Sequence, residues 1–315
     1  MRRRNHYDVT NRIDIARPEA VSEAVCELLS ALYSGAELAP VRSAFDVYQR
    51  LYAGTLRGYA GCDTWYHDAQ HSLDCALAFA RLLQGHERSA AIDDRLGARR
   101  GVLGVIAALF HDAGYIRRDG DTARNGAEFT FTHVMRSAEF LGDFLPQAGF
   151  DRETAMTRQL VHFTGYELAL DAIEVRDDKD RRLGFLLGTA DVMAQTADRC
   201  YLEKCRDYLF REFTYCGIAG PSKAGAALTK YQTPADLLKE TPDFNRKMWA
   251  ERLDGYFGGM HRYMGAHFDG PDLYSQNIHG HLARVKALAD QDALDQLRLR
   301  PHAIRAAEMR ELQTC

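Results

Sequence analysis

Apolar residues recur along the chain at the spacing expected of helices buried on one side. The period is clear in Pro18–Leu32, His71–Leu83 and His133–Gln147. No stretch of useful length alternates apolar and polar residues, as a half-buried strand does. The pattern therefore predicts an all-α protein, with further helices over Ser43–Leu56, Gly101–Asp112, Arg152–Thr164, Leu183–Phe213, Phe244–Phe268 and Val285–Leu297.

Polar, charged and glycine-rich stretches separate the predicted helices. They predict a loose leader over residues 1–15 and connections over 58–63, 84–99, 117–125, 171–182 and 217–236. We expect one body of about ten helices. Its core should span residues 61–215, with an N-terminal helical extension over 1–60 and C-terminal helices over 216–315 packing on that core.

Composition narrows the class of protein. The 315 residues are 46% hydrophobic, which is enough to bury a full core. The net charge of -4 favours neither a nucleic-acid polymer nor a membrane surface as partner. Neither a secretory signal nor a run of about 18 apolar residues is present. The seven scattered cysteines form no CxxC pair, so we expect reduced thiols in a cytoplasmic protein.

A histidine and an aspartate end the predicted helix over Gly101–Asp112. His111 and Asp112 follow an apolar run, and Gly114 is a natural helix stop. One imidazole nitrogen and one carboxylate oxygen suit Zn, Mn, Fe or similar divalent ions. An adjacent pair of this kind is common by chance, so a helix C-cap with a solvated carboxylate is the alternative.

Other histidines lie near predicted helix ends. His67 and His71 are four residues apart, so their rings point the same way if that turn is helical. His133 sits in the first turn of a helix that Thr132 can cap, and His162 lies near the end of another. Each of these histidines alone is more often structural than a metal ligand.

Asp191 stands out because it lies inside an apolar helix, between Leu186-Leu187 and Val192-Met193. An ionised carboxylate is costly to bury unless it is paired or binds a metal. A salt bridge or a hydrogen-bonded cap within the core is the alternative to a metal ligand.

Taken together, these residues resemble the HD superfamily of metal-dependent phosphohydrolases, in which a histidine, a His-Asp pair and a distant aspartate meet in a helical bundle. The segment Tyr66–Asp74 is similar to the Tyr-His-Asn-x-x-His segment of the branch that includes the cyclic-nucleotide phosphodiesterases. Leu109–Tyr115 and His133–Ala138 are similar to bacterial members. The resemblance runs from Trp65 to Arg199.

The resemblance implies that a first divalent ion is held by His71, His111, Asp112 and Asp191. It further implies that a metal-activated hydroxide attacks a small phosphoester while His67 acts as the general acid. His133 and His162 match the positions that carry a second ion in dinuclear members, with Asp112 bridging. A single-ion site, with both histidines hydrogen-bonded around it, is the alternative. Zn, Mn, Mg, Co and Fe all remain open as the native metal.

Two departures from the family pattern bear on the substrate. Asp68 replaces the usual asparagine, and Tyr115 stands where the eukaryotic phosphodiesterases carry a further histidine. Phosphoester hydrolysis is therefore a firmer expectation than cyclic-nucleotide specificity. Candidate phosphate ligands in the loop after the metal pair, which on their own would more often be solvated surface groups, are Arg117, Arg118 and Arg124.

Two other functions stay open on the same fold. A minority of HD-type proteins use a di-iron pair to activate oxygen, which would require both His133 and His162 as ligands. A non-catalytic HD domain that binds nucleotides is the third option, against which the complete ligand set argues. The expected partner is a small phosphoester, and a homodimer is left open.

Overall fold

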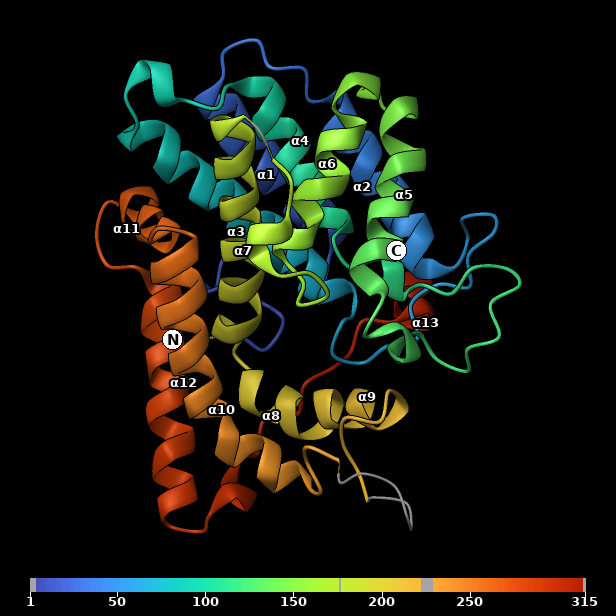
Figure 1. Cartoon of the computed structure of the whole chain (residues 1–315), viewed down its shortest axis with the longest axis vertical. Helices are drawn as coiled ribbons and strands as arrows, with labels where there is room; N and C mark the ends of the chain where they lie inside the picture. The colour runs from blue at the N-terminus through green and yellow to red at the C-terminus, as the bar shows by residue number, and fades with distance from the viewer. Residues whose placement is uncertain (1–3, 176, 222–228, 314–315) are drawn as a thin grey trace.

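The protein is built from helices joined by loops (Figure 1). The computed structural model describes residues 4–175, 177–221 and 229–313. Within these ranges the only β-type pairings are isolated bridges, so the predicted all-α class is confirmed. The helices are α1 (Pro18–Leu32), α2 (Ala39–Ala53), α3 (Ala69–Ser89), α4 (Ala98–Phe110), α5 (His133–Gln147), α6 (Thr154–Leu160), α7 (Asp178–Ala197), α8 (Tyr201–Lys204), α9 (Phe210–Tyr215), α10 (Pro234–Met248), α11 (Tyr263–Phe268), α12 (Leu273–Asp290) and α13 (Ala306–Gln313).

Shorter helical turns extend or connect these elements. Two π-helical segments, Cys205–Leu209 and Trp249–Tyr256, continue α8 and α10. Single turns of 3₁₀ helix cover Ile92–Asp94, Ala113–Tyr115, Gly126–Phe129, Asp151–Glu153, Val161–Phe163, Leu170–Ala172, Met260–Arg262 and Leu294–Gln296.

Helix α3 is the centre of the molecule. It packs against α1, α4, α7 and α11, and every residue from Ala69 to Glu87 is buried. Polar residues in this stretch have partners from distant segments, as burial requires. Gln84 Oε1 accepts from His267 Nδ1 at 2.8 Å, and Glu87 accepts from the Leu96 backbone N–H at 2.7 Å.

Some predicted helix boundaries are wrong because polar side chains make contacts that the sequence pattern does not reveal. The stretch 84–99 was expected to be a surface connection, but α3 continues to Ser89 because α11 covers its polar residues. The single long helix expected over Leu183–Phe213 stops at Ala197. There the Asp198 carboxylate accepts from the Cys200 N–H at 2.6 Å. Of the connection expected over 217–236, residues 222–228 lie outside the described ranges, and α10 begins at Pro234.

The N-terminal residues are not a loose leader. Asp8 is fully buried and forms an ion pair with Arg81 of α3, which is only 3% exposed. The Asp8 carboxylate also accepts from the backbone N–H groups of Arg12 and Ile13 at 2.9 and 3.0 Å. The prediction failed because this segment has no apolar period of its own and is held by a residue that is distant in sequence.

Replacing Asp8 by Asn is expected to destabilise the fold by about 3–5 kcal/mol at neutral pH, since it leaves Arg81 buried without its counter-ion. Burial raises the pKa of the Asp8 carboxyl, but Arg81 and the hydrogen bonds to Asp8 outweigh burial and lower its pKa below 3.8. The stabilisation is therefore present above pH 3.8 and is lost as the pH falls through the lower folded-state value. Urea unfolding at pH 7 and at pH 3 should show a smaller difference in unfolding free energy between wild type and variant at the acid pH.

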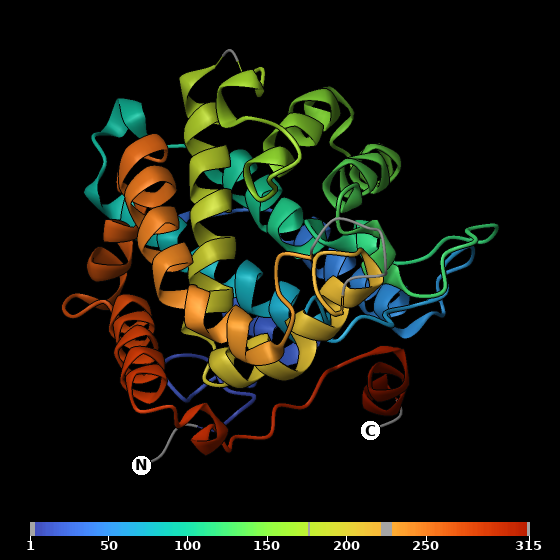
Figure 2. The ribbon, with the colours of Figure 1, turned by 60° about the horizontal axis from the view of Figure 1, so that its bottom comes forward.

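The segment that leads to α13 closes over the loop before α3 (Figure 2). The Ile304 N–H donates to Asp68 Oδ2 at 2.7 Å, and the Ile304 carbonyl accepts from the Ala69 N–H at 3.0 Å. The Ala306 N–H donates to the Cys62 carbonyl at 2.9 Å. Residues 304–306, which we call the C-terminal strap, thus hold the loop that carries His67.

All three predicted segments contribute to the main hydrophobic core, which includes Val9, Phe79 and Met309. A smaller cluster lies where α8 and α10 meet α12, around Tyr201, Leu238 and Val285. The boundaries at residues 60 and 215 stay predictions. Within the described part of the chain, no helix has the length and apolar character needed to cross a membrane.

Candidate metal centre

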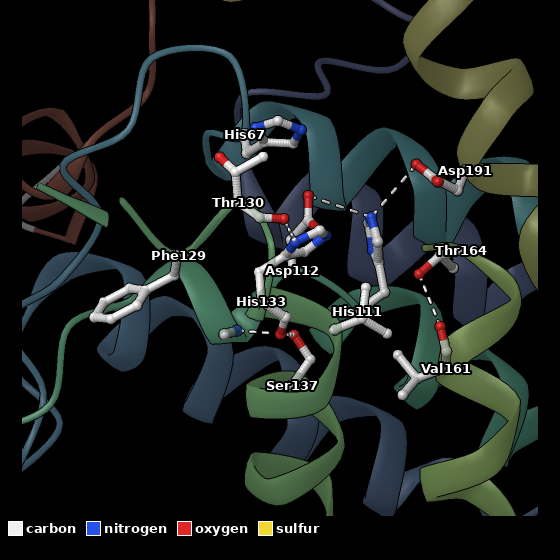
Figure 3. A network of polar contacts seen from close by, with 12 residues as sticks. His67, His111, Asp112, Phe129, Thr130, His133, Ser137, Val161, Thr164 and Asp191 are labelled. Atoms are coloured by element: carbon white, nitrogen blue, oxygen red, sulfur yellow. Dashed lines mark hydrogen bonds and ion pairs between the residues drawn. The ribbon is translucent and has the colours of Figure 1, made fainter. Parts of the chain in front are cut away.

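Four side chains from three helices meet in the interior (Figure 3 shows three of them). His71 lies in the first turn of α3, where the Asp68 side chain accepts from the His71 N–H at 3.1 Å. His111 and Asp112 directly follow α4, and Asp191 projects from α7. Because α3 packs against both α4 and α7, the four side chains face one another.

The two imidazoles and Asp191 form a tight group. His71 Nε2 and His111 Nε2 are 3.3 Å apart. Asp191 Oδ1 lies 3.2 Å from His71 Nε2 and 3.5 Å from His111 Nε2. All three residues are buried, and their ligand atoms lie within 4.8 Å of one another. This His-His-Asp group could hold a metal ion.

Asp112 lies against the same two imidazoles. Its Oδ2 atom lies 3.4 Å from His71 Nε2 and 3.3 Å from His111 Nε2. That oxygen is buried and has no hydrogen-bond partner among the described residues. A buried carboxylate oxygen without a donor is costly, and a cation would remove that cost. Two nitrogens and two carboxylates are donors that divalent ions such as Zn or Mn accept.

Neighbouring groups orient these ligands. His111 Nδ1 lies 2.8 Å from the Ala108 carbonyl, which fixes a proton on Nδ1 and leaves Nε2 directed toward the other three side chains. Gln195 donates to Asp191 Oδ1 at 3.2 Å. Burial raises the pKa of Asp191, but the contacts with His111 and His71 outweigh burial and lower it. The carboxylate is therefore ionised at neutral pH, as a metal ligand must be.

No family model, curated protein or solved structure matches the chain.

His67 is held beside the group by a residue far along the chain. It precedes α3, which begins at Ala69, so the turn from His67 to His71 is not fully helical. Glu212 of α9 is fully buried, and its Oε2 lies 2.6 Å from His67 Nδ1. Its Oε1 accepts from the backbone N–H groups of Trp65, Tyr66 and His67 at 2.7, 2.6 and 3.3 Å. Burial lowers the pKa of the His67 ring, but Glu212 outweighs burial and raises it above 6.5.

Tyr115 separates His67 from His133. Its ring stacks on the His67 ring at 4.4 Å between centroids and on the His133 ring at 4.3 Å, with interplanar angles of 16° and 20°. The imidazole of His67 is thus fixed by an aromatic face on one side and by a carboxylate at Nδ1. Sequence reasoning assigned no role to Tyr115, Gln195 or Glu212.

The two histidines predicted to bind a second ion differ in their contacts with the other candidate ligands. His133 Nε2 lies 3.7 Å from Asp112 Oδ1. Asp112 therefore directs Oδ2 toward His71 and His111, and it directs Oδ1 toward His133 (Figure 3). Burial lowers the pKa of His133 to about 4, which keeps the ring neutral. His162 is in the 3₁₀ turn after α6, and no hydrogen bond or ion pair joins it to the other candidate ligands among the described residues. The second-ion site stays a prediction.

Helix α5, which carries His133, is fixed against the turn after Asp112. Thr132 occupies the N-cap position, but its side chain does not cap the helix as predicted. The Glu167 carboxylate does so, accepting from the Val134 and Met135 N–H groups at 2.8 and 3.2 Å. Gly114 donates its N–H to Ser137 Oγ at 2.8 Å, and a Cβ at Gly114 would lie 1.8 Å from the His133 carbonyl oxygen.

Replacing Gly114 by Ala is therefore expected to destabilise the protein by about 1–3 kcal/mol, because the turn and α5 must separate. Chemical denaturation measures the change. Gly280→Ala is the control, since a Cβ there meets no atom within 4 Å and the glycine lies in helix α12. Equal stability of Gly114→Ala and the control would contradict the close approach.

The three arginines predicted to bind phosphate are engaged with carboxylates of the chain. Arg117 Nε donates to Asp63 at 2.8 Å, and Arg118 Nη1 donates to Glu139 at 2.9 Å. The Arg124 side chain is 81% exposed and lies 3.1 Å from Glu128. A role for these three residues in binding substrate stays a prediction.

Proposed function

We propose that the chain is a metal-dependent hydrolase of small phosphoesters, of the HD type. The observation that carries the proposal is the convergence of His71, His111, Asp112 and Asp191, with one buried Asp112 oxygen lacking a donor. A divalent ion bound there would polarise a phosphoryl oxygen and activate water.

The arrangement of His67 supports hydrolysis over simple binding. Its Nδ1 is engaged by Glu212, so Nε2 is the nitrogen left to exchange a proton with a substrate. A histidine whose charged form is stabilised by a buried carboxylate can hold a proton at neutral pH and deliver it to a leaving alkoxide. Tyr115 and Glu212 restrict the ring to one orientation, which general acid catalysis needs.

The test is a substrate screen on the full chain. Protein treated with EDTA and then loaded with Mn, Co, Mg or Zn should hydrolyse at least one of a set of aryl phosphodiesters, phosphomonoesters and nucleotides, and the EDTA-treated protein should not. Stoichiometric metal with no turnover of any substrate would contradict the proposal. Tight nucleotide binding in that case would favour the non-catalytic module.

A di-iron oxygenase is the second candidate, favoured by the position of His133 next to Asp112 Oδ1, the oxygen that points away from His71 and His111. Anaerobic purification followed by elemental analysis separates the two. Two irons per chain would support the oxygenase, whereas zinc or manganese without iron would remove it.

A further inference from the structure

Three lysine or arginine residues in the described part of the chain are more than nine-tenths buried: Arg81, Lys204 and Arg252, with exposures of 3%, 5% and 7%. Arg81 pairs with Asp8, and Lys204 Nζ lies 2.8 Å from Asp198 Oδ2. Arg252 has no carboxylate within ion-pair distance among the described residues. A buried charge without a counter-ion is strongly unfavourable, so Arg252 requires an explanation.

The contacts of Arg252 satisfy only part of its guanidinium. Arg252 lies in the π-helical segment after α10, and its Nη2 donates to the carbonyls of Phe163 and Gly165, both at 2.9 Å. Its Nε and Nη1 atoms are buried and have no hydrogen-bond partner among the described residues. A buried N–H that is left unpaired destabilises the fold. The unsatisfied atoms are donors on a group that carries a positive charge, which is the chemistry of an anion site.

Tyr166 covers this guanidinium. The Arg252 Cζ atom lies 4.2 Å from the centroid of the Tyr166 ring, yet Tyr166 is 66% exposed. Tyr166 sits in a connection outside the α-helices, three residues after the 3₁₀ turn that ends at Phe163. An exposed ring on such a segment can be displaced at little cost, which would open the guanidinium to a ligand.

A chain of contacts leads from Arg252 toward the candidate metal centre. The Phe163 carbonyl that Arg252 binds packs against Gly188, where a Cβ would lie only 2.6 Å from its oxygen. Gly188 is three residues before Asp191 on α7. A substrate held at the metal centre could therefore extend a second group toward Arg252.

We infer that Arg252 is an anion-binding subsite that receives a second anionic group, a phosphate or a carboxylate, of the substrate. The inference that the bound anionic group belongs to the substrate rests on the proposed function. The inference that Arg252 binds an anion does not. The substrate class is then a small phosphoester with a second negative charge, which displaces Tyr166 on binding.

Inorganic phosphate and acetate, at constant ionic strength, are the probes for the metal-free full chain. We expect phosphate, acetate or both to bind wild type, and Arg252→Gln to weaken that binding by at least about tenfold. Arg246→Gln is the matched control, because Arg246 lies on the same helical stretch but is 77% exposed and paired with Asp243. Response to phosphate alone identifies a phosphate site, and response to acetate identifies a carboxylate site. Equal anion affinity of Arg252→Gln and wild type would overturn the inference.

A second variant guards against loss of folding in Arg252→Gln. Tyr166→Ala removes an exposed ring, so it should fold and bind the same anion more tightly because no cover has to be displaced. Unchanged affinity in this variant would also overturn the inference. With metal and substrate, Arg252→Gln should raise KM and leave kcat nearly unchanged. Anion binding without hydrolysis would defeat the proposed function alone, and hydrolysis with an unaltered KM would defeat the subsite alone.

Discussion

Asp112→Ala is expected to abolish phosphoester hydrolysis and to reduce the bound metal. The variant removes the oxygen that lies 3.4 and 3.3 Å from the two imidazoles, together with the oxygen that faces His133. Loss of one charged ligand from a four-donor set should lower metal affinity by more than about a hundredfold. This loss exceeds the one usually caused by removing a residue that only hydrogen-bonds to a metal ligand. Metal content by elemental analysis and the rate of hydrolysis measure the two effects.

The control for this variant is Asp143→Ala, which removes an exposed carboxylate on α5. It should keep the metal content and activity of wild type. Asp112→Asn keeps the shape of the side chain and tests charge alone, so it should also lose metal. Hydrolysis that survives in Asp112→Ala at wild-type rate would refute the assignment of this centre as catalytic.

Glu212→Gln is expected to lower kcat by about a hundredfold or more on alkyl phosphoesters without changing the metal content. The amide keeps an oxygen for the backbone N–H groups of Trp65 and Tyr66 but no longer stabilises the charged His67 ring. Because an alkoxide leaving group needs a proton, the loss should be large for alkyl esters. It should be small for nitrophenyl esters, whose leaving group is stable without one.

That dependence on the leaving group separates proton delivery from a structural effect. A variant that merely loosened the loop before α3 would slow both kinds of ester equally. Glu240→Gln, an exposed position on α10, is the matched control and should behave as wild type. Equal losses on alkyl and nitrophenyl esters would assign Glu212 to folding of the loop and not to positioning of His67.

The sequence predicted best what depends on local pattern. The bounds of α1 and α5 match their predicted ranges, because in both helices the apolar period begins and ends with the helix itself. The meeting of His71, His111 and Asp191 was also predicted, through a family resemblance in which two of these residues lie at helix ends and Asp191 lies within α7. A short motif of that kind can be recognised in the sequence because the helix that carries it sets its geometry.

The parts that could not be predicted depend on contacts between distant residues. Glu212 lies in a helix with no motif, and its role becomes visible only when α9 is seen to place it against residues 65–67. Asp8 and Arg81 are likewise 73 residues apart. His162 was assigned as a ligand of a second ion through the family resemblance; it lies in the 3₁₀ turn after α6, and that assignment stays a prediction.

The C-terminal strap has a consequence for biosynthesis. The loop that carries His67 is held by hydrogen bonds to the backbone groups of Ile304 and Ala306. These two residues are synthesised more than two hundred residues after that loop. Ligands in α3, α4 and α7 can gather on a nascent chain, but the loop that carries His67 is secured only when translation has passed residue 306. On the proposed function, a growing chain would therefore be able to bind metal before it can hydrolyse a substrate.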